Sequence, residues 1–313
     1  MAKKTWTVLE LIDWTRAYLA ERGFENARLE TELLLGHALN LPRIELYLNY
    51  NRQMDEDELK RYKVLLKRRL AGEPVQYVTG TAAFMLSDFE VGPNVLIPRP
   101  ETEALTEVAI ELLEEAGLRR RQRGARAVES GQRPDDGPEA LLADVGTGSG
   151  VIAVTLAQEF PGARVLATDS SADALEVAAR NAGAAGVGDR VEFLEGELLK
   201  PLFAEVAKGK LLALVSNPPY VASGQIEQLP PEVRDFEPRR ALDGGPDGLD
   251  CLRAIAQDGA ALLVPDGVIV LEVGDGQAEA VAAMLGESFG SSEIRTDYAG
   301  RDRIVVGRRP GQR

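Results

Sequence analysis

The stretch "SNPPY", residues 216–220, follows the apolar run "LLALV" and places an amide and a phenol around two proline rings. Pro218 has no N–H group and its ring fixes φ, so backbone carbonyls of the turn can point toward a ligand. The side-chain oxygen of Asn217 and the carbonyl oxygen of Pro218 are two acceptors that one planar –NH2 group can satisfy together. The motif, completed by Pro219 and Tyr220, predicts a catalytic site for an amide or an aromatic amine, with the tyrosine ring on the flat face of that group. An ordinary proline turn is the alternative.

The nitrogen of such a group is a poor nucleophile because its lone pair is delocalised. Two acceptors on its N–H bonds return electron density to the nitrogen and aim it at an electrophile. If the electrophile is a sulfonium methyl group, transfer is a single in-line displacement that needs no nucleophilic side chain, metal or strong base. We therefore expect no metal site, and the only histidine, His37, lies in a separate helical region of the sequence.

A glycine-rich turn lies upstream, in "ADVGTGSGVIAVTLA", between a predicted strand and a predicted helix. A turn poor in side chains brings its backbone close to a ligand, and the following helix start presents free N–H groups. The spacing G-x-G-x-G after Asp144 favours S-adenosylmethionine, whose ammonium group can pair with an acidic residue at a strand end. The predicted cofactor-binding residues of this turn are Gly146, Thr147, Gly148, Ser149 and Gly150.

The next two strand ends supply further candidates. Asp169 ends "RVLATD", where its carboxylate can accept hydrogen bonds from both hydroxyls of a ribose. A helix N-cap is the alternative role for Asp169. In "EGELL", Glu197 or Leu198 would border an adenine. NAD and S-adenosylmethionine both contain adenosine, so these residues alone do not separate the two cofactors, whereas the "NPPY" motif favours S-adenosylmethionine.

The elements that position these residues follow an alternating pattern from Leu141 onward. Apolar strands of four to six residues alternate with helices of about a dozen residues, which indicates a parallel sheet covered by helices on both faces. The segment "EIRTDYAGRDRIVVGRR" adds one or two strands. In such open α/β sheets, ligands bind at the carboxyl ends of the strands, where all the candidate residues lie.

The amino-terminal part has a different pattern. Helical spacing predicts three short helices, one from a capping box at Thr7 and Glu10, one from Asn26, and one from Asp55 to Leu70. Residues 74–100 are rich in aromatic and β-branched residues and predict a hairpin connector. A helix is expected from Ala104 to Leu118. The aperiodic residues 119–139 then predict a mobile, solvated loop, although its arginines could also contact RNA or an acidic partner.

Composition limits the function classes. The chain has 313 residues and a formal net charge of −14, which argues against a general nucleic-acid binder. The single cysteine, Cys251, excludes an internal disulfide and a thiolate metal cluster. No apolar stretch approaches the ~20 residues of a membrane span. We expect a soluble, cytoplasmic protein that is a monomer and binds neither membrane nor nucleic acid directly.

The chain resembles, along nearly its whole length, the peptide chain release factor glutamine N5-methyltransferases of the HemK/PrmC type. "NPPY" alone occurs across amino methyltransferases of DNA, RNA and protein, whereas its combination with "IPRPETE" and "FEP..AL.GG.DGL" is far more specific. The stretches that carry the resemblance are "GEPVQYVTG", "LIPRPETE", "DVGTGSG", "ATDSSADALEVAARNA", "SNPPYV", "FEPRRALDGGPDGLDCLRAI", "VLEVGDGQ" and "DYAGRDRIVVGR".

The resemblance implies an α/β fold, with a seven-stranded, doubly wound, Rossmann-like class I methyltransferase domain at residues 101–313. A helical domain at residues 1–73 would dock the substrate, a class 1 release factor methylated on the glutamine of its Gly-Gly-Gln loop, and residues 74–100 would connect the two. Residues 146–150 would hold the methionine part of the cofactor. The resemblance further implies that Asp169 holds the ribose, Glu197 and Leu198 the adenine, and Asn217, Pro218, Pro219 and Tyr220 the glutamine amide.

The segment Arg99, Pro100, Glu101 and Thr102 resembles the part of the family that lies beside the active cleft, which makes Arg99 and Glu101 substrate-binding candidates. A helix start with Glu103 in its first turn is the alternative. Other readings of the whole chain are an N6-adenine DNA methyltransferase, a guanine N2 RNA methyltransferase, and a non-catalytic scaffold that binds the cofactor. A DNA methyltransferase should have a basic domain that recognises its target, and the sequence shows none. A scaffold that only binds the cofactor would not need Asn217.

Overall fold

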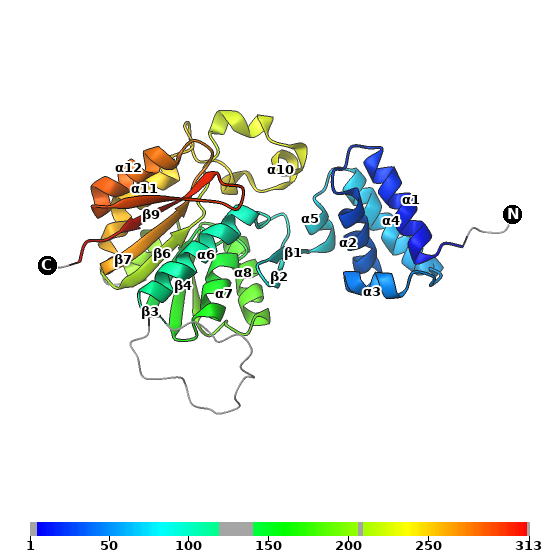
Figure 1. Ribbon diagram of the computed structural model, residues 1–313, viewed down its shortest axis with the longest axis horizontal. Coiled ribbons are helices and arrows are strands. Elements are labelled where there is room, and N and C mark those ends of the chain that lie inside the picture. Colours follow the sequence, from blue (N-terminus) through cyan, green and yellow to red (C-terminus); the bar gives the residue numbers. More distant parts are fainter. Residues whose placement is uncertain (1–4, 119–139, 206–208, 312–313) are drawn as a thin grey trace, which may run out of the picture. The chain divides into compact units, whose positions relative to one another are not determined.

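The computed structural model describes residues 5–118, 140–205 and 209–311 (Figure 1). The expected mobile loop, residues 119–139, lies outside them. The chain forms two compact units. The amino-terminal unit comprises residues 1–81 together with 230–236, and the sheet unit comprises residues 82–229 and 237–313.

The amino-terminal unit is a small helical bundle. Its helices are α1 (Val8–Ala20), α2 (Ala27–Leu39), α3 (Arg43–Leu48), α4 (Glu56–Leu70), α5 (Val75–Thr79) and α10 (Pro231–Phe236). The predicted capping box is present, because the Thr7 side chain accepts from the Glu10 N–H and the Glu10 side chain accepts from the Thr7 N–H. The three predicted helices correspond to α1, α2 and α4, while α3 and α5 were not predicted.

A buried arginine ties α10 into this bundle. The Arg69 guanidinium donates to Glu30 at 2.7 and 3.1 Å, and it lies 3.1 Å from a carboxylate oxygen of Glu232. The central carbon of the Arg69 guanidinium, Cζ, also lies 4.3 Å from the centre of the Phe24 ring. Only 3% of the Arg69 side chain is exposed, so these partners compensate a charge that would be costly to bury alone.

The connector contains a hairpin, but a shorter one than predicted. Strands β1 (Thr81–Phe84) and β2 (Ser87–Glu90) are joined by a two-residue loop. Residues 75–79 form the helix α5, which the prediction of a hairpin connector at residues 74–100 did not include. Gly80 ends α5 in the left-handed conformation, and Arg68 donates to the carbonyls of Tyr77 and Val78. These tertiary caps satisfy the helix end and override the local strand preference.

Within the described residues, the sheet unit contains a seven-stranded sheet of order β5-β4-β3-β6-β7-β9-β8. Strands β5, β4, β3, β6 and β7 are parallel, and β9 is antiparallel to both of its neighbours. The doubly wound α/β fold is therefore confirmed. The strands are β3 (Ala140–Val145), β4 (Ala163–Asp169), β5 (Val191–Glu195), β6 (Leu211–Ser216), β7 (Leu263–Glu272), β8 (Ser292–Thr296) and β9 (Asp302–Arg308).

Helices cover both faces of this sheet (Figure 1). They are α6 (Pro100–Glu115), α7 (Val151–Glu159), α8 (Ala172–Ala184), α9 (Lys200–Glu205), α11 (Asp250–Asp258) and α12 (Ala278–Phe289), with short 3-10 turns at Ser223–Gln228, Arg239–Ala241 and Gly259–Ala261. Helix α6 begins at Pro100, earlier than predicted. Proline suits the first helical position because its missing N–H would have no partner there. Glu101, Thr102 and Glu103 thus lie in the first turn.

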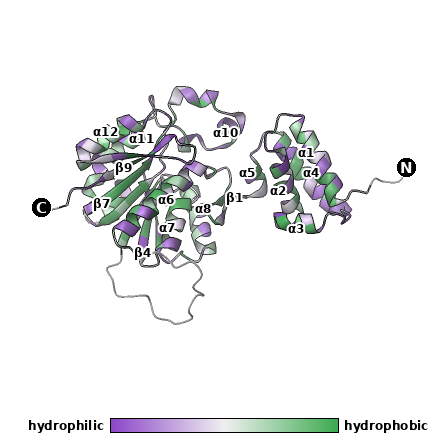
Figure 2. Ribbon diagram, viewed as in Figure 1, coloured by the Kyte–Doolittle hydropathy of each residue, from purple (hydrophilic) through white to green (hydrophobic). Residues whose placement is uncertain are grey.

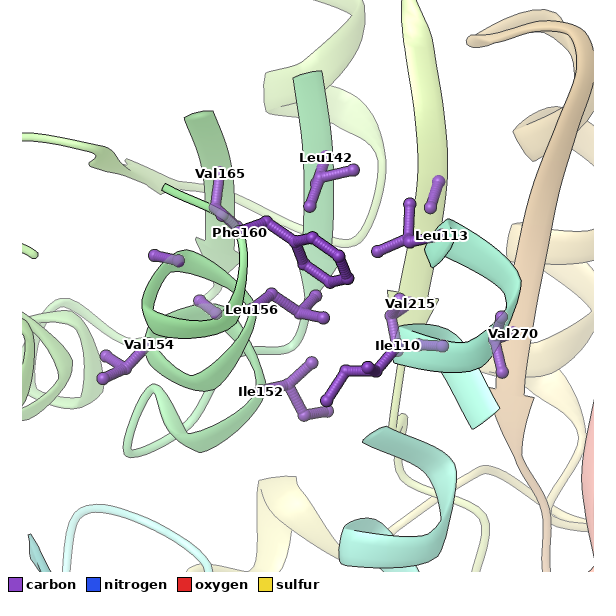
Figure 3. Close-up of a cluster of buried hydrophobic side chains, with 14 of the residues drawn as sticks. Ile110, Leu113, Leu142, Ile152, Val154, Leu156, Phe160, Val165, Val215 and Val270 are labelled. Carbon is purple, nitrogen blue, oxygen red and sulfur yellow. The ribbon is translucent and has the colours of Figure 1, made fainter. Parts of the chain in front are cut away.

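Two apolar cores follow from the alternation of side chains along the strands. Leu142 belongs to the core beneath α6 and α7, and its neighbour Ala143 belongs to the core beneath α11 and α12. Figure 3 shows the ring of Phe160 among side chains of the first core, near Leu142 and Leu156. Figure 2 shows hydrophobic residues along the central strands, as expected for a sheet buried on both faces.

The parallel register brings the candidate residues to one edge of the sheet. Val145, the last residue of β3, is paired with Thr168 on one side and with Ser216 on the other. The glycine-rich turn, Asp169 and Asn217 each directly follow these three residues. The pairing therefore places the turn, the carboxylate and the amide at adjacent strand ends.

Candidate active site

A pocket of about 240 Å³ lies at this edge and is called here the strand-end pocket. Its walls come from the glycine-rich turn, the ends of β4, β5 and β6, the first turn of α6, and loop residues near 94–98 and 238–243. Of the predicted site residues, those that line it are Gly146, Thr147, Gly148, Ser149, Asp169, Glu197, Leu198, Asn217 and Pro219. Residues predicted from four separate stretches of sequence thus share one cavity.

The glycines of the turn differ in what they make room for. Gly148 has a φ of +55°, and a Cβ there would meet no protein atom within 4 Å. Gly150 has a φ of +83°, and its Cβ would lie 2.9 Å from the Cβ of Ala178. Gly148 therefore leaves space at the pocket wall, whereas Gly150 allows close packing of α7 on α8 and does not line the pocket.

Asp144 fixes the turn from behind. One carboxylate oxygen, Oδ2, accepts from the Thr147 hydroxyl at 2.6 Å and from the Ala153 N–H at 3.1 Å. The other, Oδ1, is buried without a hydrogen-bond partner among the described residues. Complete burial raises the pKa of Asp144 to about 7. The residue does not line the pocket, so its predicted pairing with an ammonium group stays a prediction.

Asp169 connects two segments of the pocket wall. Its Oδ2 accepts from the Gly148 N–H at 2.9 Å, and its Oδ1 accepts from the Ser171 N–H at 2.9 Å. The N-cap of α8 is Ser171, whose side chain accepts from the Ala174 N–H, so Asp169 does not cap the helix. Each carboxylate oxygen can still accept a further hydrogen bond, which suits the hydroxyls of a ribose.

Glu197 and Leu198 form the wall that follows β5. The Glu197 carboxylate is exposed and pairs with Lys200, which lowers the pKa of Glu197. Leu198 has a φ of +50°, an uncommon conformation for a leucine, and its carbonyl accepts from the Thr168 hydroxyl at 3.1 Å. The backbone at Leu198 is thus held in a sparsely populated conformation at the pocket.

Asn217 enters the pocket with its amide already engaged. Its Nδ2 donates to the Thr102 hydroxyl oxygen at 2.9 Å. The oxygen Oδ1 of the same amide is therefore directed away from Thr102. Pro218 is buried and does not line the pocket, while Pro219 does.

Tyr220 does not line the pocket either. Its hydroxyl donates to Glu272 Oε1 at 3.2 Å, and its ring packs against the core beneath α11 and α12. Burial and the neighbouring Glu272 carboxylate raise the pKa of Tyr220. The predicted role of this ring as a cover for the substrate group stays a prediction.

Glu272 is a member of the site that sequence reasoning missed. It ends β7, is completely buried, and accepts from the Thr102 hydroxyl at 2.7 Å as well as from Tyr220. Burial raises the pKa of Glu272 to about 7. The stretches "VLEVGDGQ" and "LIPRPETE" contain Glu272 and Thr102, but neither stretch shows that the two side chains meet.

The remaining predicted substrate residues lie outside the lining. Arg99 pairs with Glu237, whose other oxygen accepts from the Ile97 N–H at 3.2 Å. Glu101 accepts from Arg301 at 2.6 Å.

Cys251 also lines the strand-end pocket, a placement that the sequence did not suggest. It is a free thiol, and burial raises its pKa.

Two kinds of feature are absent from residues 5–118, 140–205 and 209–311. No group of three or more histidine, cysteine, aspartate or glutamate side chains there could hold a metal ion. No helix in the same ranges is long and apolar enough to cross a membrane.

S-adenosylmethionine fits the residues of the pocket. Asp169 has acceptor capacity left for ribose hydroxyls, and Gly148 leaves space for a ligand beside the turn. The acceptors of Asp169 and the space beside the turn thus suit the nucleoside part of this cofactor.

The chain matches two family models. The PrmC N-terminal domain matches residues 10–80, and the methyltransferase small domain matches residues 133–229. Among solved structures, a methyltransferase from Pyrococcus furiosus has a TM-score of 0.46 at 16% identity, covering 80% of this chain and 98% of that one. A likeness at this level carries no argument about function.

Several curated relatives are similar over almost the entire chain. The release factor glutamine methyltransferase of Chlorobaculum tepidum is 43% identical over 302 residues, covering 96% of this chain and 97% of that protein. The protein of the same name from Geobacter sulfurreducens is 43% identical over 304 residues and covers 97% of each chain. That from Moorella thermoacetica is 42% identical over 292 residues, covering 92% of this chain and 93% of that protein. The resemblance noted in the sequence is confirmed, and the chain belongs to the release factor glutamine methyltransferase family.

Proposed function

We propose that the protein transfers a methyl group from S-adenosylmethionine to the side-chain amide nitrogen of the glutamine in the Gly-Gly-Gln loop of a class 1 release factor. The observation that carries this proposal is the amide of Asn217. It lies in the same pocket as Gly148 and Asp169, and its nitrogen is occupied by Thr102. The Asn217 oxygen is then available to accept an N–H of the glutamine amide.

The residues of the pocket have separate roles in this reaction. The turn at residues 146–150, of which residues 146–149 line the pocket, holds the methionine part of S-adenosylmethionine. Asp169 accepts from the ribose, and Glu197 with Leu198 borders the adenine. When bound, S-adenosylmethionine supplies an electrophilic methyl group and a neutral thioether leaving group. The protein holds the substrate nitrogen and the methyl group in line and donates or accepts hydrogen bonds around them. Orientation of this kind lowers the barrier of a single displacement.

The substrate amide is activated by hydrogen-bond acceptors. Asn217 Oδ1 and the carbonyl oxygen of Pro218 each accept one N–H of the glutamine side chain, which orients the nitrogen lone pair and increases its electron density. Tyr220 holds the Pro-Pro turn, while Arg99 and Glu101 contribute to the surface beside the glutamine. After methyl transfer the nitrogen loses its extra proton to solvent, so no strong base is needed.

Substrate docking belongs to the amino-terminal part of the chain. The division into residues 1–73 for docking, 74–100 as connector and 101–313 for catalysis is supported by the PrmC N-terminal domain match at residues 10–80. The protein acts as a monomer in the cytoplasm, where translation takes place. Its net charge of −14 disfavours nucleic acid as the direct partner.

The test is methyl transfer from radiolabelled S-adenosylmethionine to three acceptors in parallel, namely purified class 1 release factor, bulk tRNA and bulk DNA. Label in the release factor alone is the expected result. Label in tRNA or DNA alone would show that the pocket methylates an exocyclic base amine instead and would overturn the proposal.

A further inference from the structure

We propose that Glu272 and Thr102 are positioning residues that fix which way the Asn217 amide points, and that this relay, rather than packing, presents the Asn217 oxygen to the substrate. The inference rests on the proposed function, because it assumes that Asn217 accepts an N–H of the substrate amide. It assigns roles to two side chains, one of which, Glu272, does not line the strand-end pocket.

The first step of the relay is the hydrogen bond between Thr102 and Glu272. An ionised carboxylate can only accept, and a threonine hydroxyl carries a single hydrogen. That hydrogen is directed to Glu272 Oε2 at 2.7 Å. The Thr102 oxygen therefore has only lone pairs left for its other neighbour.

The second step of the relay fixes the orientation of the Asn217 side-chain amide. Asn217 Nδ2 lies 2.9 Å from the Thr102 oxygen, which accepts from it. The two ends of an amide have nearly the same size, so packing alone distinguishes them poorly. If the amide of Asn217 were reversed, its oxygen would face the oxygen of Thr102, and its NH2 group would face the N–H bonds of the substrate. Both contacts would be unfavourable, so the relay selects one orientation.

The same carboxylate also holds the other end of the tetrapeptide. Glu272 Oε1 accepts from the Tyr220 hydroxyl at 3.2 Å, so Asn217 is tied to Glu272 through Thr102 and Tyr220 is tied to it directly. The two prolines between them are rigid. One buried carboxylate at the end of β7 thus anchors both sides of the proline turn.

Charged and titratable groups around Glu272 come from several elements. Tyr220 follows β6, Glu101 lies in the first turn of α6, and Arg303 lies on β9. Glu101 opposes a negative charge on Glu272, and Arg303 favours it. Burial disfavours the carboxylate form that the relay requires, and the two hydroxyl donors and the Arg303 guanidinium offset this effect in part.

The hydroxyl of Thr102 is tested with matched substitutions in α6. Thr102→Val keeps the shape and removes the hydroxyl, and we expect kcat to fall about tenfold or more because the acceptor is no longer oriented. The dissociation constant for S-adenosylmethionine and the KM for release factor should change by less than about threefold, as expected when only transition-state positioning is lost. Thr102→Ser, which keeps the hydroxyl, should recover most of the loss.

Thr106→Val is the control. Thr106 is buried one turn further along α6, and its hydroxyl donates to the Thr102 backbone carbonyl at 2.8 Å. It reports the cost of removing a buried threonine hydroxyl from this helix while the side chains of Thr102, Glu272 and Asn217 stay in place. A Thr102→Val kcat equal to that of Thr106→Val would overturn the proposal, as would equal losses in Thr102→Val and Thr102→Ser.

Coupling between the two positions provides the second test. Glu272→Met removes both acceptors at similar volume, and it should lower kcat by a similar factor. If Glu272 acts through Thr102, the double variant Glu272→Met/Thr102→Val should be no slower than the slower single variant, whereas independent roles would multiply the two losses. A double variant whose kcat falls by the product of the two single losses would overturn the relay. If Glu272→Met does not fold, the comparison of Thr102→Val, Thr102→Ser and Thr106→Val tests the proposal without it.

Failure of the relay and failure of the proposed function give different results. A wild-type enzyme that labels no release factor would overturn the proposed function and the relay with it. A wild-type enzyme that labels release factor, together with a Thr102→Val enzyme of equal kcat, would overturn the relay alone.

Discussion

The amide nitrogen of Asn217 donates to the hydroxyl oxygen of Thr102 at 2.9 Å, across 115 positions of sequence. This contact joins the end of β6 to the first turn of α6 at the wall of the strand-end pocket. It leaves the oxygen of the Asn217 side chain as the acceptor that the proposed reaction requires.

Replacing Asn217 with alanine should therefore affect turnover more than cofactor binding. We expect Asn217→Ala to lower kcat about 100-fold, the size of effect seen when one preorganised hydrogen-bonding group is removed from a catalytic site. The dissociation constant for S-adenosylmethionine, measured by calorimetry, should stay within about threefold of wild type. Turnover near the wild-type value would contradict the role of the Asn217 oxygen.

Asp169→Ala should weaken cofactor binding. A hydrogen bond to a charged group contributes about 1.5 to 3 kcal/mol, so the dissociation constant for S-adenosylmethionine should rise at least tenfold. Asp173→Ala is the control, because Asp173 is exposed in the first turn of α8 and does not line the pocket. Equal affinities of the two variants by calorimetry would show that Asp169 does not bind the ribose.

The two glycines of the turn should separate stability from binding. Gly150→Ala combines a left-handed backbone with a Cβ 2.9 Å from that of Ala178, so we expect a loss of about 2 kcal/mol or more in unfolding free energy. Gly148→Ala meets no protein atom within 4 Å and should lose only about 1 to 2 kcal/mol from its backbone conformation. Its S-adenosylmethionine affinity should nevertheless fall, because the new methyl group occupies the pocket wall. Denaturant titration measures the loss of stability in each variant, and calorimetry measures the affinity for S-adenosylmethionine. Unchanged affinity in Gly148→Ala would contradict the proposal that this turn binds the cofactor.

Glu272 should make stability depend on pH. Burial raises its pKa from the ordinary 4.5 to about 7, so between these values the folded protein binds more protons than the unfolded chain. Its contribution to stability is therefore complete below pH 4.5 and is lost as the pH rises through about 7. Asp144, whose pKa is also raised to about 7, acts in the same direction. Glu272→Gln cannot ionise, so its unfolding free energy should fall less between pH 5 and pH 8 than that of wild type.

Activity should follow the opposite trend, because the relay uses the ionised form of Glu272. The wild-type kcat is expected to rise with pH through about 7, the pKa of Glu272. This rise should be absent or displaced in Glu272→Gln. Identical pH profiles of kcat for the two enzymes would show that ionisation of Glu272 does not control the site.

Much of the sheet unit could be predicted because its signals are local. The turn at Gly146, Gly148 and Gly150 follows a strand and precedes a helix, and the strand ends at Asp169 and Asn217 carry polar residues after apolar runs. Parallel pairing then brings these ends together without further information. Nine of the residues predicted for the site line one pocket for this reason.

The features that the sequence did not predict depend on contacts between residues far apart in the chain. Thr102 and Glu272 are 170 positions apart, and no periodicity links a threonine in a helix start to a glutamate at a strand end. The hydrogen bond from the Tyr220 hydroxyl to the same glutamate joins residues 52 positions apart and has no local signal either. The helix at residues 75–79 depends in part on caps from Arg68, which propensity at those residues does not show.

The central claim is that the enzyme methylates the amide nitrogen of the Gly-Gly-Gln glutamine. The most direct measurement is transfer of a radiolabelled methyl group from S-adenosylmethionine to a class 1 release factor and to its Gln→Ala loop variant, with Asn217→Ala enzyme in parallel. The account predicts label in the unaltered factor only, at a rate about 100-fold lower with Asn217→Ala enzyme than with wild-type enzyme. Equal label in the Gln→Ala factor would place the methyl group elsewhere and contradict the claim.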